Sequence, residues 1–557
     1  MRTPLPFASL PIPLLALLAA ACTSGAGERP SRQAAEPVIP LDTLQSLTRQ
    51  LSTDEFEGRA PGTRGEQLTV DLLAGAFRQA GLQPGNNGSY FQNVPLVQIT
   101  AQGRPALRVT GGAQPLSFAY RTDMVAGTYR VQPQVSLPSS DIVFVGYGIN
   151  APERRWNDYQ GLDVRGKTVV ILVNDPDWQT PTLDGPFGGR AMTYYGRWTY
   201  KYEEAARQGA AAAFIVHQTE PASYAWNVVE NSWTGPQHYL DRPGGNMDQT
   251  IVNGWLTQDA ARRLFAAGGQ DLDALSARAR QQGFRPVPLG RLKASMDVTS
   301  TIERQQSRNV VGILPGRTRP NEYLLYTAHW DHLGICAETG ADRICNGATD
   351  NATGTAALAA LAQAHARQRP ERSIVFIAVT AEESGLLGSR YYAENPIFPL
   401  NRTVAGINMD SLNMAGVTRD FIATGAGKSE LDRWLERVLT ARGIRLAPET
   451  TPEAGYYYRS DHFSFARQGV PMIYARGGED LVSGGSATGR AWAAEYRANR
   501  YHQSGDEFLT SWDWTGAVRD LEVYYEVMTA LANSREWPNW NQGDEFRAIR
   551  DRSRAGQ

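Results

Sequence analysis

Short apolar runs alternate with amphipathic stretches throughout the second half of the chain. The apolar runs have the length and the β-branched and aromatic content of strands, and they lie at residues 309–314, 323–328, 373–380, 404–409 and 470–474. The amphipathic stretches have helical spacing and lie at about 351–368, 387–394, 428–442 and 515–533. Because alternating strands and helices are typical of α/β proteins, we predict a three-layer sandwich around a mostly parallel mixed sheet. Its catalytic part is expected at residues 291–540.

The first half of the chain has two different patterns. In residues 39–125, leucines recur at helical spacing from Leu41 to Leu51, and a second amphipathic helix ends near Gly81. We assign this stretch to the same domain. Residues 126–290 instead contain short β runs around a broken helix, which predicts a β-rich insert. The glycine-rich segment 477–489 is expected to be a mobile surface loop, and 541–557 a polar tail.

Composition narrows the class of protein. The 557 residues are 42% hydrophobic and 20% charged, which is ordinary for a globular chain. The formal net charge is −2, so no strong positive field is available to bind nucleic acid. Three cysteines are too few for a disulfide scaffold.

The first residues have the pattern of an export signal. Residues 1–22 combine an early arginine, a short apolar run and small residues that lead to Cys22, as in a bacterial lipobox. The apolar run is shorter than the roughly 20 residues that span a bilayer. Residues 23–38 are small and polar, as in a flexible tether. We expect an exported protein, in the periplasm, on the outer membrane through a lipid on Cys22, or secreted. In the alternative, a plain signal peptide is cleaved nearby and Cys22 is incidental.

Export permits a stable disulfide. Cys336 and Cys345 flank a short loop, and we predict that they form a bridge in an oxidising compartment.

Acids and imidazoles follow directly after the predicted strands. His329 and Asp331 follow the strand at 323–328, and the adjacent acids Glu382 and Glu383 follow the strand at 373–380. Asp410 follows the strand at 404–409, and Asp350 opens an alanine-rich helix. Because ligands bind at the carboxyl ends of strands in open α/β sheets, we expect these side chains to meet there.

Such a set suits a pair of metal ions. Zinc takes histidine nitrogen and carboxylate oxygen, and two zinc ions need a carboxylate that bridges them. A further carboxylate must accept the proton of the attacking water. Neighbours at a strand end point in opposite directions, so one of Glu382 and Glu383 can bind metal while the other faces the substrate.

The motifs resemble those of the di-zinc exopeptidases that include aminopeptidase Y, bacterial leucyl aminopeptidases and glutamate carboxypeptidase II. They are H-x-D at 329–331, G-A-x-D-N-x-x-G at 347–354, E-E-x-G-x-x-G-S at 382–389, N-x-D at 408–410 and a late histidine. Within the insert, G-Y-G at 146–148 and D-V-R-G-K at 163–167 resemble the protease-associated domain, a module that covers substrate access. A generic β-rich insertion is the alternative.

The resemblance implies a role for each residue. Asp350 bridges two Zn²⁺ ions, His329 and Asp410 complete one site, and Glu383 and a late histidine complete the other. That histidine is either His502 or His462, and the H-x-x-x-D spacing at 502–506 favours His502.

Five further residues receive roles from the same resemblance. Glu382 is the general base, Asp331 orients His329, and Tyr501 donates a hydrogen bond to the developing oxyanion. His462 and Asp461 line the substrate pocket. The remaining histidines, 217, 238, 332 and 365, are expected to be structural.

The implied function is an exported, zinc-dependent metallo-aminopeptidase that uses metal-activated water to remove N-terminal residues from peptides or proteins. Three alternatives stay open: a carboxypeptidase of the glutamate carboxypeptidase type, a glutaminyl-cyclase-like transferase and an inactive binding ectodomain. A carboxypeptidase needs a cationic anchor, and Arg459, Arg476 and Arg490 are candidates that the sequence alone does not place. Residue preference and oligomeric state are not predicted.

Overall fold

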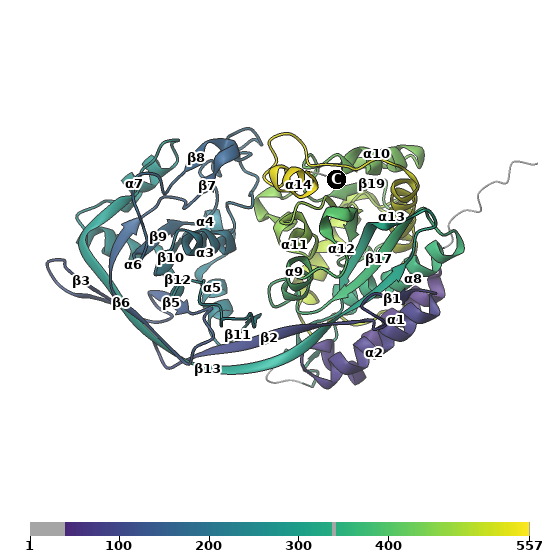
Figure 1. Ribbon diagram of the computed structural model, residues 1–557, viewed down its shortest axis with the longest axis horizontal. Helices are drawn as coiled ribbons and strands as arrows, with labels where there is room; N and C mark the ends of the chain where they lie inside the picture. Colours follow the sequence, from purple (N-terminus) through teal and green to yellow (C-terminus); the bar gives the residue numbers. More distant parts are fainter. Residues whose placement is uncertain (1–38, 337–340, 556–557) are drawn as a thin grey trace, which may run out of the picture. The chain divides into compact units, whose positions relative to one another are not determined.

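The computed structural model describes residues 39–336 and 341–555 (Figure 1). The predicted signal peptide, the tether and Cys22 lie outside these residues. No helix in the described part of the chain is long and apolar enough to cross a membrane.

A mixed sheet forms the centre of the catalytic part. In spatial order its strands are β13 (Val287–Leu314), β17 (Arg372–Val379), β14 (Arg319–His329), β18 (Thr403–Asn408), β21 (Met472–Gly477), β19 (Asp420–Ala423) and β20 (Arg445–Ala447). Strands β17, β14, β18 and β21 are parallel, whereas β13 is antiparallel to β17 and β19 to β21. This sheet confirms the predicted mostly parallel mixed topology.

Helices cover both faces of this sheet, because its strands alternate apolar side chains to either side. On one face, Leu324, Tyr326 and Ile374 pack against helices α1 (Leu41–Leu51), α2 (Arg64–Gln79), α8 (Thr353–Arg367), α10 (Leu431–Ala441) and α13 (Thr515–Asn533). On the other face, Leu325 and Val375 pack against α9 (Leu387–Glu394) and α11 (His462–Ala466). The three predicted layers are confirmed.

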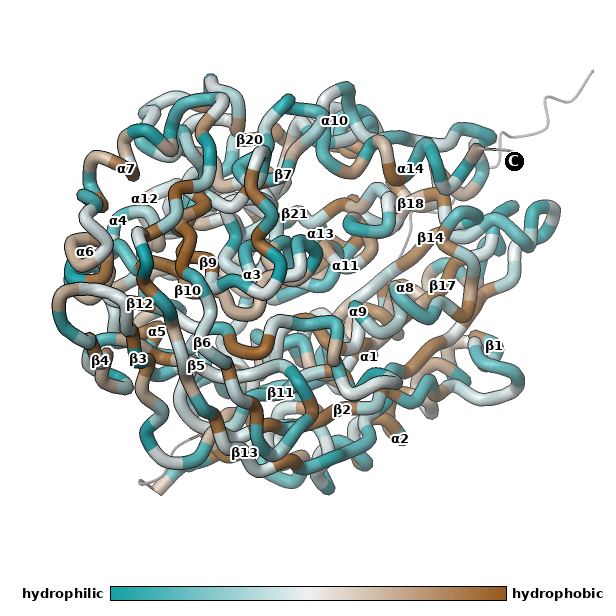
Figure 2. Tube along the Cα trace, turned by 60° about the vertical axis from the view of Figure 1, so that its left-hand side comes forward, coloured by the Kyte–Doolittle hydropathy of each residue, from teal (hydrophilic) through white to brown (hydrophobic). Residues whose placement is uncertain are grey.

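The insert has its own set of strands, joined to the central sheet through β13, and its own core. Its central strands are β6 (Gln134–Phe144), β9 (Thr168–Leu172), β10 (Ala212–His217), β12 (Val252–Thr257) and β5 (Met124–Gly127), of which the first four are parallel. One face is covered by α3 (Trp198–Arg207) and α5 (Trp226–Trp233), and the other by α6 (Gln258–Ala267) and α7 (Leu272–Ala279). The tube through β9 and β10 is mostly brown in Figure 2, in keeping with strands that are buried on both faces.

One long strand belongs to both parts. The first half of β13 pairs with β6 of the insert, and its last residues, Val310 to Leu314, pair with β17 of the central sheet. Figure 1 shows it running beneath both. Strand β2 (Phe91–Gln102) pairs with β13 from Thr299 to Val310. Strand β11 (Pro236–Leu240) then pairs with β2. The expected domain limits at 125/126 and 290/291 therefore fall inside strands β5 and β13.

Several local details differ from the sequence expectation. Helix α12 (Gly485–Asn499) begins inside the segment expected to be a loop, because the small residues at its start are followed by good helix formers. Cys336 and Cys345 form the predicted disulfide. The remaining elements are β1 (Gln83–Pro84), β3 (Leu107–Thr110), β4 (Leu116–Phe118), β7 (Asn150–Ala151), β8 (Trp156–Asn157), β15 (Gly334–Ile335), β16 (Ile344–Cys345), α4 (Thr219–Ala222), α14 (Arg547–Arg554) and several single turns.

Candidate metal centre

The predicted ligands gather at the carboxyl edge of the central sheet. His329 is the last residue of β14, Glu383 lies four residues after β17, and Asp410 lies two residues after β18. These three strands are neighbours and parallel, so their carboxyl ends lie at the same edge. His329 and Asp350 are almost fully buried.

Asp350 faces two different imidazoles with its two carboxylate oxygens. Its Oδ1 lies 3.2 Å from Nε2 of His329, and its Oδ2 lies 3.4 Å from Nε2 of His502. Asp410 Oδ1 lies 3.4 Å from His329 Nε2, and Glu383 Oε2 lies 3.1 Å from His502 Nε2. The structure thus brings together all five predicted ligands, with Asp350 between the other two pairs.

The donor atoms fit zinc. One ligand atom from each of His329, Asp350 and Glu383 lies within 4.8 Å of the others, and the same holds for His329, Glu382 and Asp410. Histidine nitrogen and carboxylate oxygen are the donors that catalytic zinc takes in proteins. A carboxylate with one oxygen turned to each group is the arrangement that a pair of ions requires.

Burial and an excess of acids perturb this site strongly. Burial by itself would lower the pKa of His329, but the charge of Glu382 and hydrogen bonds to Asp350 and Asp410 raise it well above its usual value. Burial raises the pKa of Asp331 to about 7, with the nearby charge of His329 acting against this rise and that of Glu383 adding to it. A buried site with more acids than cations stabilises an added positive ion.

Asp331 connects two of the strand ends. Its carboxylate accepts hydrogen bonds from the main-chain N–H groups of Glu382, at 3.1 Å, and Glu383, at 3.4 Å. Its main-chain oxygen lies 3.1 Å from Nδ1 of His329, whereas the nearest carboxylate oxygen is 3.8 Å from that atom. The main-chain carbonyl group of Asp331 is therefore the closer partner of His329, and the orienting role of its carboxylate stays a prediction.

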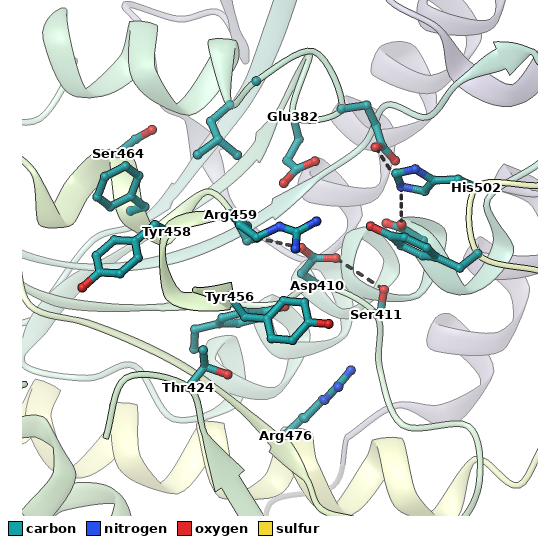
Figure 3. Close-up of a pocket in the computed structure, with 18 of the residues that line it drawn as sticks. Glu382, Asp410, Ser411, Thr424, Tyr456, Tyr458, Arg459, Ser464, Arg476 and His502 are labelled. Carbon is teal, nitrogen blue, oxygen red and sulfur yellow. Dashed lines mark hydrogen bonds and ion pairs between the residues drawn. The ribbon is translucent and has the colours of Figure 1, made fainter. Parts of the chain in front are cut away.

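A cavity of about 830 Å³ opens beside the cluster, lined by residues of the central sheet and of the insert. Figure 3 shows Glu382, Asp410 and His502 around this cavity. Glu382 lines it without a side-chain hydrogen bond to any described residue, which leaves its carboxylate open to a substrate or water. Tyr501 also lines the cavity, is 40% exposed, and stacks on His502 with ring centroids 3.9 Å apart.

The expectation that His462 and Asp461 line the pocket is wrong. Both are fully buried, and the ring of His462 lies between Tyr457 and Tyr474, at centroid distances of 4.6 and 4.7 Å. The cavity is lined instead by Ser460, Phe463 and Ser464. These three positions share one face because this segment turns into the helix α11, so 461 and 462 point into the core.

Sequence reasoning missed two residues that brace the loops of the centre. The fully buried guanidinium of Arg59 donates hydrogen bonds to the carbonyl oxygens of Trp330, Asn346 and Gly347, at 2.8, 2.6 and 2.9 Å. It thereby joins the loop after His329 to the loop before Asp350. The E-G-R turn at 57–59 was visible in the sequence, but nothing in it indicated these partners.

The second of these residues is Asp506. Its carboxylate accepts hydrogen bonds from the main-chain N–H groups of Thr349, at 3.1 Å, and Asp350, at 3.0 Å. The H-x-x-x-D spacing pointed to this residue, though not to its contact with the Asp350 loop.

The fold and these donors define a class: an α/β sandwich with a cluster of metal-binding side chains at the carboxyl edge of its sheet. Residues 309–526 match the model of "Peptidase family M28". That part of the chain, which holds every predicted ligand, is similar to peptidase family M28.

Individual relatives agree with this assignment. The chain is 34% identical over 138 residues to the mouse protein named aminopeptidase NAALADL1, a match that covers 23% of this chain and 17% of that protein. It is 34% identical over 433 residues to a Caenorhabditis elegans protein named glutamate carboxypeptidase 2 homolog, covering 67% of this chain and 51% of that one. The chain therefore spans about half or less of the length of these relatives.

A solved structure, an aminopeptidase from Aneurinibacillus sp. strain AM-1, is 20% identical to this chain. The superposition covers 90% of this chain and 95% of that one, with a TM-score of 0.48.

Proposed function

We propose that this protein is an exported, zinc-dependent exopeptidase that acts chiefly as an aminopeptidase. The observation that carries the proposal is Asp350, whose two oxygens face His329 and His502 beside a cavity that Glu382 also lines. The family of residues 309–526 supports hydrolysis of peptide bonds.

The site residues divide the chemistry among them. Two zinc ions, held by His329 and Asp410 on one side and by Glu383 and His502 on the other with Asp350 shared, would supply an activated water and a polarised carbonyl. The carboxylate of Glu382 accepts the proton of the attacking water. It then passes that proton to the leaving amine, so that the amine departs neutral.

An aminopeptidase also needs a partner for the free amine of its substrate. Glu449 and Glu479 line the cavity and are not among the predicted ligands. A protonated amine placed against either carboxylate would set the first peptide bond of the substrate near Glu382. Tyr501 also lines the cavity, and in this proposal its hydroxyl donates a hydrogen bond to the oxyanion.

A second candidate, a carboxypeptidase, has its own support. Arg459 and Arg476 both line the cavity, and the insert contributes Arg197. No carboxylate among the described residues lies within 4.0 Å of the guanidinium groups of these three arginines, which leaves them available to a carboxylate of the substrate. Arg490, the third arginine that the sequence offered, is not among the residues that line the cavity.

One panel of peptides separates the candidates. The same short sequence is offered with a free N-terminus, with a blocked N-terminus and with an amidated C-terminus, each with and without a chelator. An aminopeptidase does not cleave the N-blocked peptide, and a carboxypeptidase does not cleave the C-amidated peptide. Cleavage that survives complete removal of metal would refute the proposal as a whole.

The location of the protein is a separate proposal, which rests on the sequence of residues 1–22. Mass spectrometry of the mature N-terminus tests it. A diacylglycerol on Cys22 indicates a lipoprotein, a free N-terminus near Cys22 indicates a periplasmic or secreted protein, and an intact Met1 would refute export.

A further inference from the structure

His332 was expected to be an ordinary core histidine, yet it contacts a predicted metal ligand. It is 1% exposed and follows β14 by three residues. Its Nδ1 lies 2.7 Å from Oε1 of Glu383, a short hydrogen bond between buried groups.

The two carboxylate oxygens of Glu383 have different neighbours. Oε1 is held by Nδ1 of His332, whereas Oε2 lies 3.1 Å from Nε2 of His502. An ionised carboxylate only accepts hydrogen bonds, so Nδ1 of His332 must carry the proton and donate it.

The ring of His332 is fixed by its packing. A Cβ atom added to Gly347 would meet Cγ and Cδ2 of His332 at 2.5 Å, so only glycine leaves room for the imidazole at this place. The main-chain N–H of His332 also donates to the carbonyl oxygen of Arg59, at 3.4 Å. The ring meets that of His502 edge to face, with centroids 5.7 Å apart. The imidazole therefore has a single orientation in which it reaches Glu383.

We propose that His332 is a positioning residue that holds Oε1 of Glu383, so that Glu383 presents one oxygen, Oε2, to the metal ion it shares with His502 and Asp350. The inference rests on the metal centre of the proposed function. Without His332, the carboxylate is free to rotate or to offer both oxygens, and the ion at this half of the site is held less well.

Two substitutions test the hydrogen bond. His332→Leu keeps a buried side chain of similar size and removes the donor, whereas His332→Asn places an amide N–H close to the position of Nδ1. His365→Leu is the matched control, because His365 is also fully buried in the catalytic part and has one hydrogen bond, to Tyr326 at 3.2 Å. The full chain of each variant is stripped of metal and titrated with Zn²⁺ in competition with a chelator, and then with Co²⁺ to record the absorption spectrum.

We expect His332→Leu to weaken one of two zinc-binding steps by about 10- to 100-fold and to change the Co²⁺ spectrum, with the other step nearly unchanged. His332→Asn should recover most of that affinity. His365→Leu should lower the melting temperature and leave both binding steps as in the wild type.

Three results would overturn the inference. One is wild-type zinc affinity in His332→Leu, and another is an equal loss in all three variants, since that would reflect damage to the fold alone. The third is a wild-type protein that binds fewer than two ions. If the wild-type protein binds two ions but cleaves no peptide, the proposed function fails while the titrations still decide the role of His332.

Discussion

Two clusters of buried charge in this protein have very different neighbours. At the metal centre, Asp350, Glu383 and Asp410 are turned towards histidines and towards each other. In the insert, Lys201 lies among Asp158 and Asp175, and all three are buried. Both clusters place carboxylates in the interior, but of the two only the first lines the cavity of about 830 Å³.

The insert satisfies its charges from its own chain. Nζ of Lys201 donates to the carbonyl oxygens of Tyr147 and Asn174, at 2.7 and 3.0 Å. Asp175 accepts hydrogen bonds from the main-chain N–H and the hydroxyl group of Thr193, at 2.7 and 2.8 Å. These contacts tie the loop at 174–193 to α3, so the cluster has a structural role.

The metal centre has imidazole partners for its acids, such as His332 for Glu383, but no lysine or arginine ion pair among the described residues. Its acids outnumber its cations, and the predicted ligands come from the ends of three strands and from two loops. Buried carboxylates whose charge the chain does not neutralise indicate a site for a bound metal ion. Buried carboxylates that the chain neutralises indicate a structural role. The following four variants test this difference, in order of decreasing effect.

The largest effect is expected from Asp350→Asn. The amide offers one oxygen in place of two and removes a charge that both halves of the site share, so metal binding should fall by more than about 100-fold and activity with it. Elemental analysis after gel filtration measures the bound zinc. The control Asp175→Asn, in the insert, should bind as much zinc as the wild type. An equal loss of zinc in both variants would show that the two clusters do not differ in metal binding.

Glu382→Gln should separate metal binding from turnover. Because Glu382 is proposed to move a proton and not to hold an ion, zinc content should stay at the wild-type level while kcat falls by about 10²- to 10⁴-fold. Parallel metal analysis and initial-rate measurements give both quantities. Full activity in this variant would exclude Glu382 as the base.

Lys201→Met should lower the stability of the insert and leave the zinc content of the protein unchanged. Removal of the buried cation takes a nearby positive charge from Asp175 and leaves the carbonyl oxygens of Tyr147 and Asn174 without their donor, which costs about 3–5 kcal/mol of unfolding free energy. Urea titration measures the loss. Lys167→Met is the control, since Lys167 pairs with the exposed Asp141 at 3.6 Å and should cost no more than about 1 kcal/mol.

The smallest effect is a pH dependence carried by Asp158. Burial raises its pKa to about 7, so the folded protein keeps this carboxyl protonated at pH values where the unfolded chain has lost the proton. Its contribution to stability is therefore complete near pH 4 and is lost as the pH rises to about 7, with a slope of at most about 1.4 kcal/mol per pH unit. Asp158→Asn should flatten the stability of the protein between these pH values, as measured by urea midpoints. An unchanged slope in the variant would show that Asp158 is ionised in the folded state.

Much of the metal centre could be predicted from the sequence. His329, Glu383 and Asp410 each follow an apolar run, and the ends of parallel strands share one edge of a sheet. The order of strands and helices in the catalytic part also follows from periodicity, and helices α9 and α13 have the predicted limits. These features depend on local pattern, which a single sequence carries.

Other features depend on contacts between distant segments. Arg59 reaches Gly347 across 288 positions, and β2 pairs with β13 across about 200. Neither pairing leaves a periodic signal in the residues themselves. The arginines of the cavity likewise come from distant segments: Arg197 precedes α3 of the insert, Arg459 precedes α11, and Arg476 lies in β21.

The sequence by itself determined which residue types stand at the ends of the strands, and with them the chemistry that this protein can perform. The tertiary structure alone decided which way each side chain faces: it turned His462 and Asp461 into the core and His332 towards Glu383. The physical reason is that the periodicity of apolar residues determines which face of a helix or strand is buried. Beyond the end of a strand, the direction of a side chain instead depends on the residues that pack against it.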